Sequence, residues 1–353
     1  MVTSQIPRKM KIGFFECEGW EEEYINKKYP YLSKIGDINY FDITVQDAIK
    51  EGINLGEYDV LSIFIYSKID EHILSLLKNC KVIITRSTGY DHIDVEYAKR
   101  KGIKVYNIYD YGTNTVAEFT ILLMLMILRK IKKIFYDYEI HEKIDPRAFR
   151  GEELKDKTIG IVGTGNIGTR VIELLQPFNV KILAYSRHKK KDIEIKYNVT
   201  YVDKFEDLLK ESDIISFHVP LTPQTYHMLN KNNIKYLKKG AYIINTSRGG
   251  VIDTEAIIIG IKEGRIKAIA MDVFEGEKLE RMEMDIMLRS SHDLDELKKG
   301  LAHQILRHNE NIIVTPHIAY DTEEAIYRIL NTTVDIIISY YNNTLDSVMS
   351  YLL

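Results

Sequence analysis

A glycine-rich turn between an apolar, strand-like run and a helix-like run constrains the fold of this chain most strongly. Residues 161–168 read IVGTGNIG, so Gly163, Gly165 and Gly168 form the pattern G-x-G-x-x-G. In such a turn the first glycine allows the tight bend, the second lets the backbone approach a pyrophosphate, and the third permits close helix–strand packing. The pattern therefore predicts a dinucleotide-binding unit, and a glycine-rich turn without a ligand is the alternative.

Short apolar runs alternate with polar, helix-like stretches along most of the chain. Five runs rich in β-branched and aromatic residues come first: KIGFFE, INYFDI, VLSIFIY, KVIITRS and KVYNI. A second series follows the helix-like region 114–140: TIGIVG, KILAYS, IISFHV, AYIINTS, AIAMDVF and NIIVTP. This alternation predicts an α/β protein with two doubly wound domains, each built on a parallel sheet.

The last helix-like segment has apolar residues at helical spacing and is expected to return to the first domain. The spacing is seen at Ala325, Leu330, Val334 and Ile338. We therefore expect one discontinuous domain of residues 1–110 and 320–353, and a dinucleotide-binding domain of residues 111–319. A long polar insertion, residues 276–310, separates two strands of the second domain.

The bulk composition excludes several classes of protein. The formal net charge of −3 gives no overall attraction to nucleic acid or to an anionic membrane. The longest apolar run, residues 119–128, is about half the length that spans a bilayer, and the first residues lack a signal-peptide core. Cys17 and Cys80 have no metal-ligand spacing and HExxH is absent. We expect a cytoplasmic protein without a metal site.

The end of the strand after the glycine turn lacks the acid that usually holds the ribose of NAD. Ser186 stands there, near the expected distance of about 20 residues after the glycines. Unlike Asp, it does not repel a 2′-phosphate. Arg187 can pair with a phosphate through its fork of donors, and His188 could add charge. We expect all three to contact the cofactor and favour NADP(H) over NAD(H), with a solvated basic loop as the alternative.

Three further strand ends carry side chains suited to the reduction of a carbonyl group. INTSRGGVID contains Arg248, which could hold a carboxylate. MDVFEGE contains Asp272, Glu275 and Glu277, and spacing alone leaves open which acid acts. VTPHIAY places His317 after a proline. Arginine, a carboxylate and imidazole together suit a nicotinamide-dependent reductase, because the carboxylate favours the protonated imidazole. Taken alone, each could be a surface or structural residue.

The chain resembles the D-isomer-specific 2-hydroxyacid dehydrogenase family along nearly its whole length. The motifs that carry the resemblance are TRSTGYDHID, TVAEFT, GIVGTGNIG, SDIISFHVPLT, INTSRGGVIDTEAI, MDVFEGE and TPHIAY. Within the family the chain is most similar to the D-lactate dehydrogenase branch, through SIFIYSKI, STGYDHID, Tyr111 and the insertion after DVFEGE. The resemblance implies a Rossmann cofactor domain, a flavodoxin-like substrate domain, a cleft between them and a homodimer.

The resemblance also assigns roles to residues. It makes Arg248 and His317 catalytic, and it identifies the catalytic acid as Glu277 rather than Glu275. The implied substrate-binding residues are Thr88, Gly89, Tyr111 and Arg248. The implied cofactor-binding residues, beside the three glycines, are Asn166, Ile167, His218, Val219, Pro220, Thr225, Thr246, Ser247 and Asp272.

By this resemblance the expected activity is reduction of pyruvate, or a similar small 2-oxo acid, to the D-2-hydroxy acid with NAD or NADP. Two departures keep alternatives open. The D-lactate branch commonly has Asp where Ser186 stands, and YSR is similar to members that reduce glyoxylate or hydroxypyruvate with NADPH. IYDYGTNTVAE lacks the proline residues that usually flank Tyr111. Glyoxylate or hydroxypyruvate reduction is one alternative. A nucleotide-sensing, corepressor-like binding protein is another, although Arg248, Glu277 and His317 argue against it.

Overall fold

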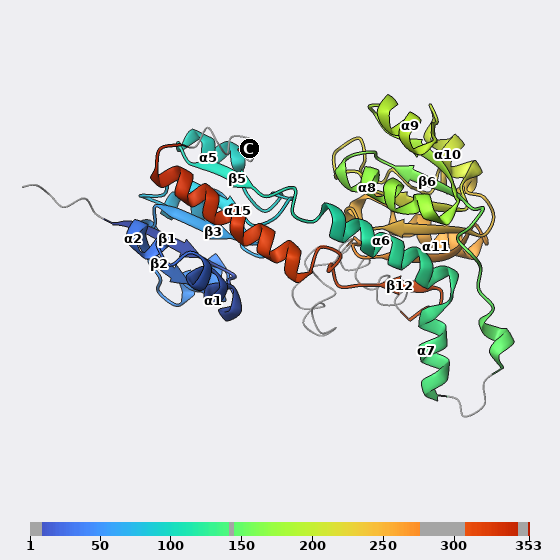
Figure 1. The fold of residues 1–353 in the computed structure, drawn as a ribbon, viewed down its shortest axis with the longest axis horizontal. Coiled ribbons are helices and arrows are strands. Elements are labelled where there is room, and N and C mark those ends of the chain that lie inside the picture. Colours follow the sequence, from blue (N-terminus) through green and yellow to red (C-terminus); the bar gives the residue numbers. More distant parts are fainter. Residues whose placement is uncertain (1–8, 141–144, 276–307, 345–351) are drawn as a thin grey trace, which may run out of the picture. The chain divides into compact units, whose positions relative to one another are not determined.

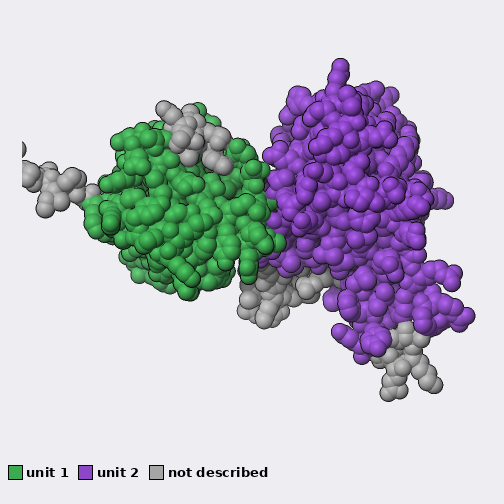
Figure 2. Space-filling model, in the orientation of Figure 1, with its two compact units in different colours: residues 1–112, 322–353 green, residues 113–321 purple. Residues whose placement is uncertain are grey.

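A computed structural model describes residues 9–140, 145–275, 308–344 and 352–353 of the chain. The chain divides into two compact units, shown in separate colours in Figure 2. Unit 1 consists of residues 1–112 and 322–353, and unit 2 of residues 113–321. Each unit contains one parallel β-sheet (Figure 1), which confirms the predicted α/β fold class.

Unit 1 is built on a five-stranded sheet with the strand order β2-β1-β3-β4-β5, the order of flavodoxin-like folds. All its strand pairs are parallel. Both faces of such a sheet are covered, so β-branched residues such as Val82, Ile83 and Ile84 are fully buried. The strands are β1 (Met10–Phe14), β2 (Gly36–Tyr40), β3 (Val60–Ile63), β4 (Val82–Thr85) and β5 (Lys104–Asn107).

The helices of unit 1 come from both ends of the chain. The last of them, α15, has the predicted apolar stripe, with Ala325, Leu330 and Val334 fully buried. Asn331 Oδ1 on α15 accepts hydrogen bonds from the hydroxyls of Tyr24 (2.9 Å) and Tyr29 (2.7 Å), which ties α15 to α1. The helical segments are α1 (Gly19–Lys28), α2 (Leu32–Ile35), α3 (Val45–Lys50), η1 (Leu55–Glu57), α4 (Glu71–Leu76), α5 (Val95–Arg100) and α15 (Glu323–Tyr341).

Unit 2 is built on a seven-stranded parallel sheet with the order β12-β11-β10-β9-β6-β7-β8. All strands are parallel, but successive strands are added from β6 to β8 on one side of the sheet and from β9 to β12 on the other. The boundary between β6 and β9 is therefore a switch point, and ligands bind outside the carboxyl ends of the strands at such a point. The shortest strands include β8, which the sequence pattern did not predict. The strands are β6 (Thr158–Val162), β7 (Lys181–Tyr185), β8 (Val199–Tyr201), β9 (Ile214–Phe217), β10 (Ala241–Asn245), β11 (Ile266–Met271) and β12 (Ile312–Val314).

The apolar run 119–128 forms the second half of helix α6, whose Ala117, Leu123 and Met124 are fully buried in the core of unit 2. No helix in the described part of the chain is long and apolar enough to cross a bilayer. Residues 276–307 of the predicted insertion 276–310 lie outside the described residues. The helical segments of unit 2 are α6 (Thr113–Leu128), α7 (Ile131–Ile140), η2 (Pro146–Phe149), α8 (Asn166–Leu175), η3 (Gln176–Phe178), α9 (Lys191–Tyr197), α10 (Phe205–Glu211), η4 (Ile234–Tyr236), η5 (Gly249–Val251) and α11 (Thr254–Lys262).

A carboxylate network ties together the amino-terminal ends of three strands of unit 2. Glu152 accepts hydrogen bonds from Lys157 (2.5 Å), Tyr242 (2.8 Å) and Lys267. Burial alone would raise the pKa of Glu152, but these three donors lower it to about 2. A pKa below the unfolded-state value means that the ionised carboxylate stabilises the fold above about pH 4.5, and that this contribution is lost as the pH falls towards 2.

We expect Glu152→Gln to lower the free energy of unfolding of unit 2 at pH 7 by about 1–2 kcal/mol, a value reduced for the partial exposure of the side chain. The difference from the wild type should shrink as the pH falls from about 4.5 towards 2, because the wild-type carboxylate then becomes neutral as well. Urea unfolding followed by circular dichroism at several pH values measures this. The exposed neighbour Glu153→Gln is the control, and a difference independent of pH would contradict the prediction.

Candidate cofactor and active site

The three glycines of the turn after β6 have three different surroundings. Gly163 has φ +95°, and a Cβ there would lie 2.6 Å from the carbonyl oxygen of His218, at the end of β9. A Cβ on Gly168 would lie 2.0 Å from the carbonyl oxygen of Gly163. A Cβ on Gly165 would meet no heavy atom within 4 Å. The first and third glycines are therefore required by the protein's own packing, whereas the second faces open space.

The open side of Gly165 lies at the amino-terminal end of α8. Asn166 and Ile167 begin this helix, and the N–H groups of a first helical turn have no acceptor within the helix. These N–H groups and the helix dipole favour an anion. Tyr201 stabilises the turn, because its hydroxyl donates to Thr164 Oγ1 at 3.1 Å. The described residues therefore fit a pyrophosphate above Gly165.

The strand end after β7 carries the predicted basic residues at its surface. Ser186 is partly exposed, and Arg187 and His188 are exposed. Lys189 is paired with Asp203 at 2.5 Å. Because Gly163 N–H donates to the carbonyl of Tyr185 at 2.8 Å, this strand end lies beside the glycine turn. The arrangement leaves the side chains of residues 186–188 accessible to a bound nucleotide.

His218 follows β9, on the other side of the switch point. Its Nε2 lies 2.8 Å from Ser216 Oγ, and its Nδ1 has no hydrogen-bond partner among the described residues. Burial lowers the pKa of His218 to about 3, so its imidazole is neutral at pH 7. The chain then passes Val219 and Pro220 and turns back at Thr225, whose Oγ1 accepts from the N–H of Thr222 at 2.8 Å.

The loop after β10 is organised by Asn245, a fully buried residue that the sequence analysis did not single out. Its Oδ1 accepts from Ser247 N (3.1 Å) and Ser247 Oγ (2.8 Å), and its Nδ2 donates to the carbonyl of Arg248 at 3.1 Å. Thr246 Oγ1 lies 2.9 Å from Thr120 Oγ1 on α6. These bonds fix the backbone on both sides of the half-buried Arg248.

The turn that carries His317 is fixed by the carboxylate of Asp272, which is 1% exposed. Asp272 Oδ1 accepts from Thr315 Oγ1 (2.6 Å) and Ile318 N (2.9 Å), and Oδ2 accepts from Ala319 N (2.9 Å). His317 itself has φ +56° and donates its N–H to the carbonyl of Asp272 at 3.1 Å. A non-glycine residue in this region is uncommon and persists where its surroundings hold it, often at functional sites.

The two glutamates after β11 are separated by the limit of the described residues. Glu275 is buried and bonded to His227 and Thr254. Glu277, the acid that the resemblance implies, lies outside the described residues. The structure therefore shows that both carboxylate oxygens of Glu275 are hydrogen-bonded to His227 and Thr254. The catalytic role of Glu277 stays a prediction.

The expected substrate loop of unit 1 follows β4. Asn107 Nδ2 donates to the carbonyl of Thr88 at 2.9 Å, and Ser87 Oγ donates to the carbonyl of Gly89 at 2.7 Å. Both carbonyls are thus held by the protein. Tyr111 is 8% exposed, and its carbonyl accepts from Arg328 Nε at 2.9 Å.

Within unit 2, the structure brings the glycine turn, residues 186–188, His218, Arg248, Asp272 and His317 to the carboxyl edge of one sheet. The sequence did not predict a role for Asn245 or His227, because their roles depend on hydrogen bonds that no sequence spacing encodes. The sheet order, the switch point and the open glycine turn define a dinucleotide-binding α/β protein.

Comparisons with known proteins identify the family. Residues 121–319 match the family model described as D-isomer specific 2-hydroxyacid dehydrogenase, NAD binding domain. A glyoxylate reductase of Thermofilum pendens is 39% identical over 78% of this chain and 76% of the relative. A D-specific alpha-keto acid dehydrogenase of Enterococcus faecium is 35% identical over 92% of this chain and 94% of the relative.

A solved structure agrees with these relatives. The D-lactate dehydrogenase from Aquifex aeolicus, complexed with NAD and lactic acid, superposes with a TM-score of 0.84 at 31% identity, covering 97% of this chain and 98% of that chain. The protein belongs to the D-isomer specific 2-hydroxyacid dehydrogenase family. It is an oxidoreductase of the D-2-hydroxyacid dehydrogenase class that uses NAD(P).

Proposed function

We propose that the protein reduces pyruvate, or a similar small 2-oxo acid, to the D-2-hydroxy acid, with Arg248, Glu277 and His317 as catalytic residues. The observation that carries the proposal is the fixed turn at His317. Asp272, at the end of β11, holds this turn after β12 through three hydrogen bonds, and the neighbouring strand β10 leads to Arg248. An imidazole and a guanidinium group thus follow the two strands on either side of β11, at one sheet edge.

In the proposed reaction the reduced nicotinamide, when bound, supplies the hydride that reaches the carbonyl carbon of the 2-oxo acid. His317 holds the proton that passes to the carbonyl oxygen, so that a C–H and an O–H bond form as the C=O double bond becomes single. Arg248 binds the substrate carboxylate through its planar fork of donors. Glu277 is proposed to keep the His317 imidazole oriented and protonated.

We further propose that unit 1 is the substrate domain and unit 2 the cofactor domain. The N–H groups of Thr88 and Gly89 are proposed to face the substrate carboxylate, with Tyr111 on the substrate side. Support comes from the two loop carbonyls, which are turned onto Asn107 and Ser87. The cofactor is proposed to contact the turn and strand ends of unit 2 at Gly163, Gly165, Asn166, Ile167, Gly168, Ser186, Arg187, His188, His218, Val219, Pro220, Thr225, Thr246, Ser247 and Asp272.

A substrate matrix tests the activity. Purified protein is assayed with pyruvate, glyoxylate, hydroxypyruvate and a branched 2-oxo acid, each with NADH and with NADPH, and kcat/KM is compared. Reduction of glyoxylate or hydroxypyruvate is the second candidate, because relatives named glyoxylate reductase and hydroxypyruvate reductase are 39% and 38% identical to this chain. No turnover of any 2-oxo acid, together with tight nucleotide binding, would contradict both and favour a nucleotide-sensing protein.

We propose that NADPH is the preferred cofactor. Ser186 carries no charge that would repel a 2′-phosphate, and the exposed Arg187 stands directly after it. We expect Arg187→Ala to raise the dissociation constant of NADPH by about 10- to 100-fold and that of NADH by much less, because only NADPH offers a phosphate to the guanidinium group. Nucleotide fluorescence titration measures both constants. Lys191→Ala, also exposed, is the control. Equal losses for the two nucleotides would mean that Arg187 only stacks on adenine.

We propose that the protein is a cytoplasmic homodimer and that α7 contributes to the contact. Figure 1 shows α7 extending from the end of α6, away from the sheet of unit 2. Three of its aromatic residues, Phe135, Tyr136 and Tyr138, are 63–76% exposed. Large apolar side chains gathered on one exposed helix suit an association surface. Cys17 and Cys80 are both free thiols, as in a reducing compartment. A solution mass equal to that of one 41.1 kDa chain would contradict the dimer.

A further inference from the structure

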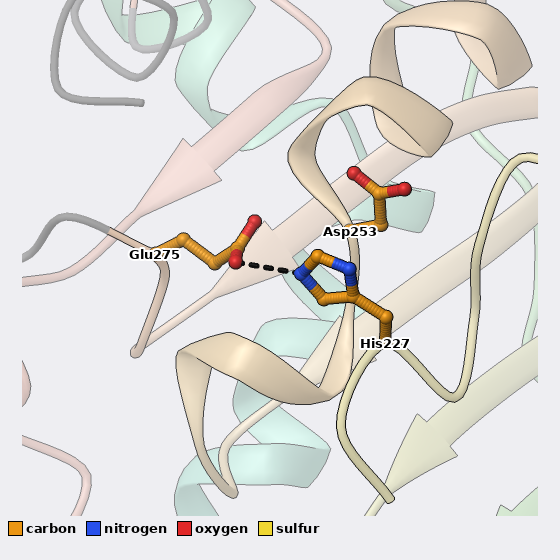
Figure 3. A group of neighbouring side chains, drawn as sticks. All are labelled: His227, Asp253 and Glu275. Carbon is orange, nitrogen blue, oxygen red and sulfur yellow. Dashed lines mark hydrogen bonds and ion pairs between the residues drawn. The ribbon is translucent and has the colours of Figure 1, made fainter. Parts of the chain in front are cut away.

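Three loops at the carboxyl edge of the seven-stranded sheet meet at the buried carboxylate of Glu275. Figure 3 shows this group with His227 and Asp253. Glu275 Oε1 lies 2.7 Å from His227 Nε2, in the loop after β9. Glu275 Oε2 accepts from Thr254 N at 3.1 Å and from Thr254 Oγ1 at 3.0 Å, at the start of α11. A carboxylate that is only 8% exposed thus has partners on both oxygens.

The main chain joins the same three loops. His227 N–H donates to the carbonyl of Gly250 at 2.8 Å, and the His227 carbonyl accepts from Asn230 Nδ2 at 2.8 Å. Gly249 lies so close to Phe274 that a Cβ would come within 2.2 Å of its carbonyl carbon. His227 has φ +49°, a conformation that a non-glycine residue keeps only where its surroundings fix it. These contacts therefore hold the three loops in fixed positions relative to one another.

The cluster has ligand types that could bind a metal ion, since one atom from each of His227, Asp253 and Glu275 lies within 4.8 Å of the others. However, both Glu275 oxygens already accept hydrogen bonds, and Asp253 Oδ1 accepts from Glu255 N at 2.9 Å as the cap of α11. A buried carboxylate with its donors in place needs no cation. The geometry favours a hydrogen-bonded brace.

This brace lies next to two of the proposed catalytic residues in the chain. Glu275 stands two residues before Glu277, and Gly249 and Gly250 directly follow Arg248. We infer that His227 and Glu275 are positioning residues for hydride transfer: their bond holds the Arg248 loop in one position relative to the end of β11. The inference rests on the proposed role of Arg248. Misplacement of a reacting group by about 1 Å costs about 100-fold in rate, so a loosened brace should slow the reaction without removing a reacting group.

A pair of substitutions at His227 separates the hydrogen bond from the backbone strain. Leu and Gln bear similar costs in the left-handed region, but the Gln side-chain amide can donate to Glu275 from near the position of His Nε2, whereas Leu cannot donate. We expect His227→Leu to lower kcat about 10- to 100-fold and to raise KM for the 2-oxo acid. His227→Gln should recover most of this loss. Glu275→Gln should resemble His227→Leu.

Activity is measured per bound nucleotide, so that a smaller folded fraction does not count as slower catalysis. The dissociation constant of the nucleotide should stay within about twofold of wild type in all variants. The exposed residues His308→Leu and Glu263→Gln are the matched controls. If His227→Leu and His227→Gln lose the same kcat, or if the loss vanishes when rates are counted per bound nucleotide, the brace is merely structural and the inference is overturned.

Three further outcomes are distinct. A rise in melting temperature with Zn²⁺ that is present in wild type and absent in His227→Leu would make the cluster a metal site and overturn the brace. A wild-type protein without turnover of any 2-oxo acid would overturn the proposed function, and this inference with it. An active wild type whose His227→Leu variant keeps its full kcat would overturn the inference alone.

Discussion

Replacing His317 is expected to lower kcat for 2-oxo acid reduction by about 10²- to 10⁴-fold, the usual contribution of a general acid. Asn is a better replacement than Ala, because His317 has φ +56° and Asn tolerates this region. The asparagine variant therefore keeps the turn while removing a side chain that can deliver a proton. Nucleotide affinity should change little, since the hydrogen bonds of Asp272 to Thr315, Ile318 and Ala319 remain.

The measurement is a steady-state assay at saturating nucleotide, with melting temperature and nucleotide binding measured on the same samples. His308→Asn is the matched control, because His308 is an exposed histidine of the same unit. A His317→Asn variant that keeps more than about a tenth of wild-type kcat would remove His317 from the mechanism, because general acids contribute far more than that. The proposal would then have to move the proton source to another group.

The second large effect is expected at Asp272. Asp272→Asn replaces one acceptor oxygen by an NH₂ group that must face a donor, either Ala319 N–H or the pair Thr315 O–H and Ile318 N–H. A buried donor left without an acceptor costs about 1–3 kcal/mol, and hydrogen bonds to a charged acceptor are at the upper end. We expect the free energy of unfolding of unit 2 to fall by about 2–3 kcal/mol.

The same substitution should lower kcat by more than about tenfold, because the turn at His317 loses its anchor. Chemical unfolding followed by circular dichroism, together with the steady-state assay, measures both effects. Asp321→Asn is the control, since Asp321 is exposed at the end of the same turn. A loss of stability with unchanged kcat would show that Asp272 holds the fold but does not position His317.

The sequence predicts the framework of this protein better than its fine structure. β-branched runs such as VIIT and AYIIN are strands because a parallel sheet covered on both faces buries every residue. The sequence did not predict β8, because the strand Val199–Tyr201 is too short to show the alternation of apolar and polar residues that marks a strand. The structure also distinguishes the three glycines, since Gly163 and Gly168 serve internal packing and Gly165 faces open space.

The positions of the strand-end residues follow from topology, whereas their partners do not. Parallel strands bring Arg248, Asp272 and His317 to one sheet edge, as the sequence indicated. No local pattern reveals that Asn245 fixes the Arg248 loop or that Glu275 is bonded to His227. Such bonds depend on side-chain geometry between residues far apart in the chain. The prediction that Glu277 is the catalytic acid rests on the resemblance alone, and Glu277 lies outside the described residues.

The division of unit 1 between both ends of the chain has a consequence for biosynthesis. Unit 2 is one continuous segment, residues 113–321, so it can fold as soon as it leaves the ribosome. Unit 1 waits for α15, whose Leu330 and Ile336 are fully buried and whose Asn331 binds two tyrosines near α1. At about 5–20 residues per second, the first hundred residues remain without this helix for about 10–50 s. Unit 1 is thus completed only after residues 323–341 have been made, and the apolar face that α15 covers is without its partner until then.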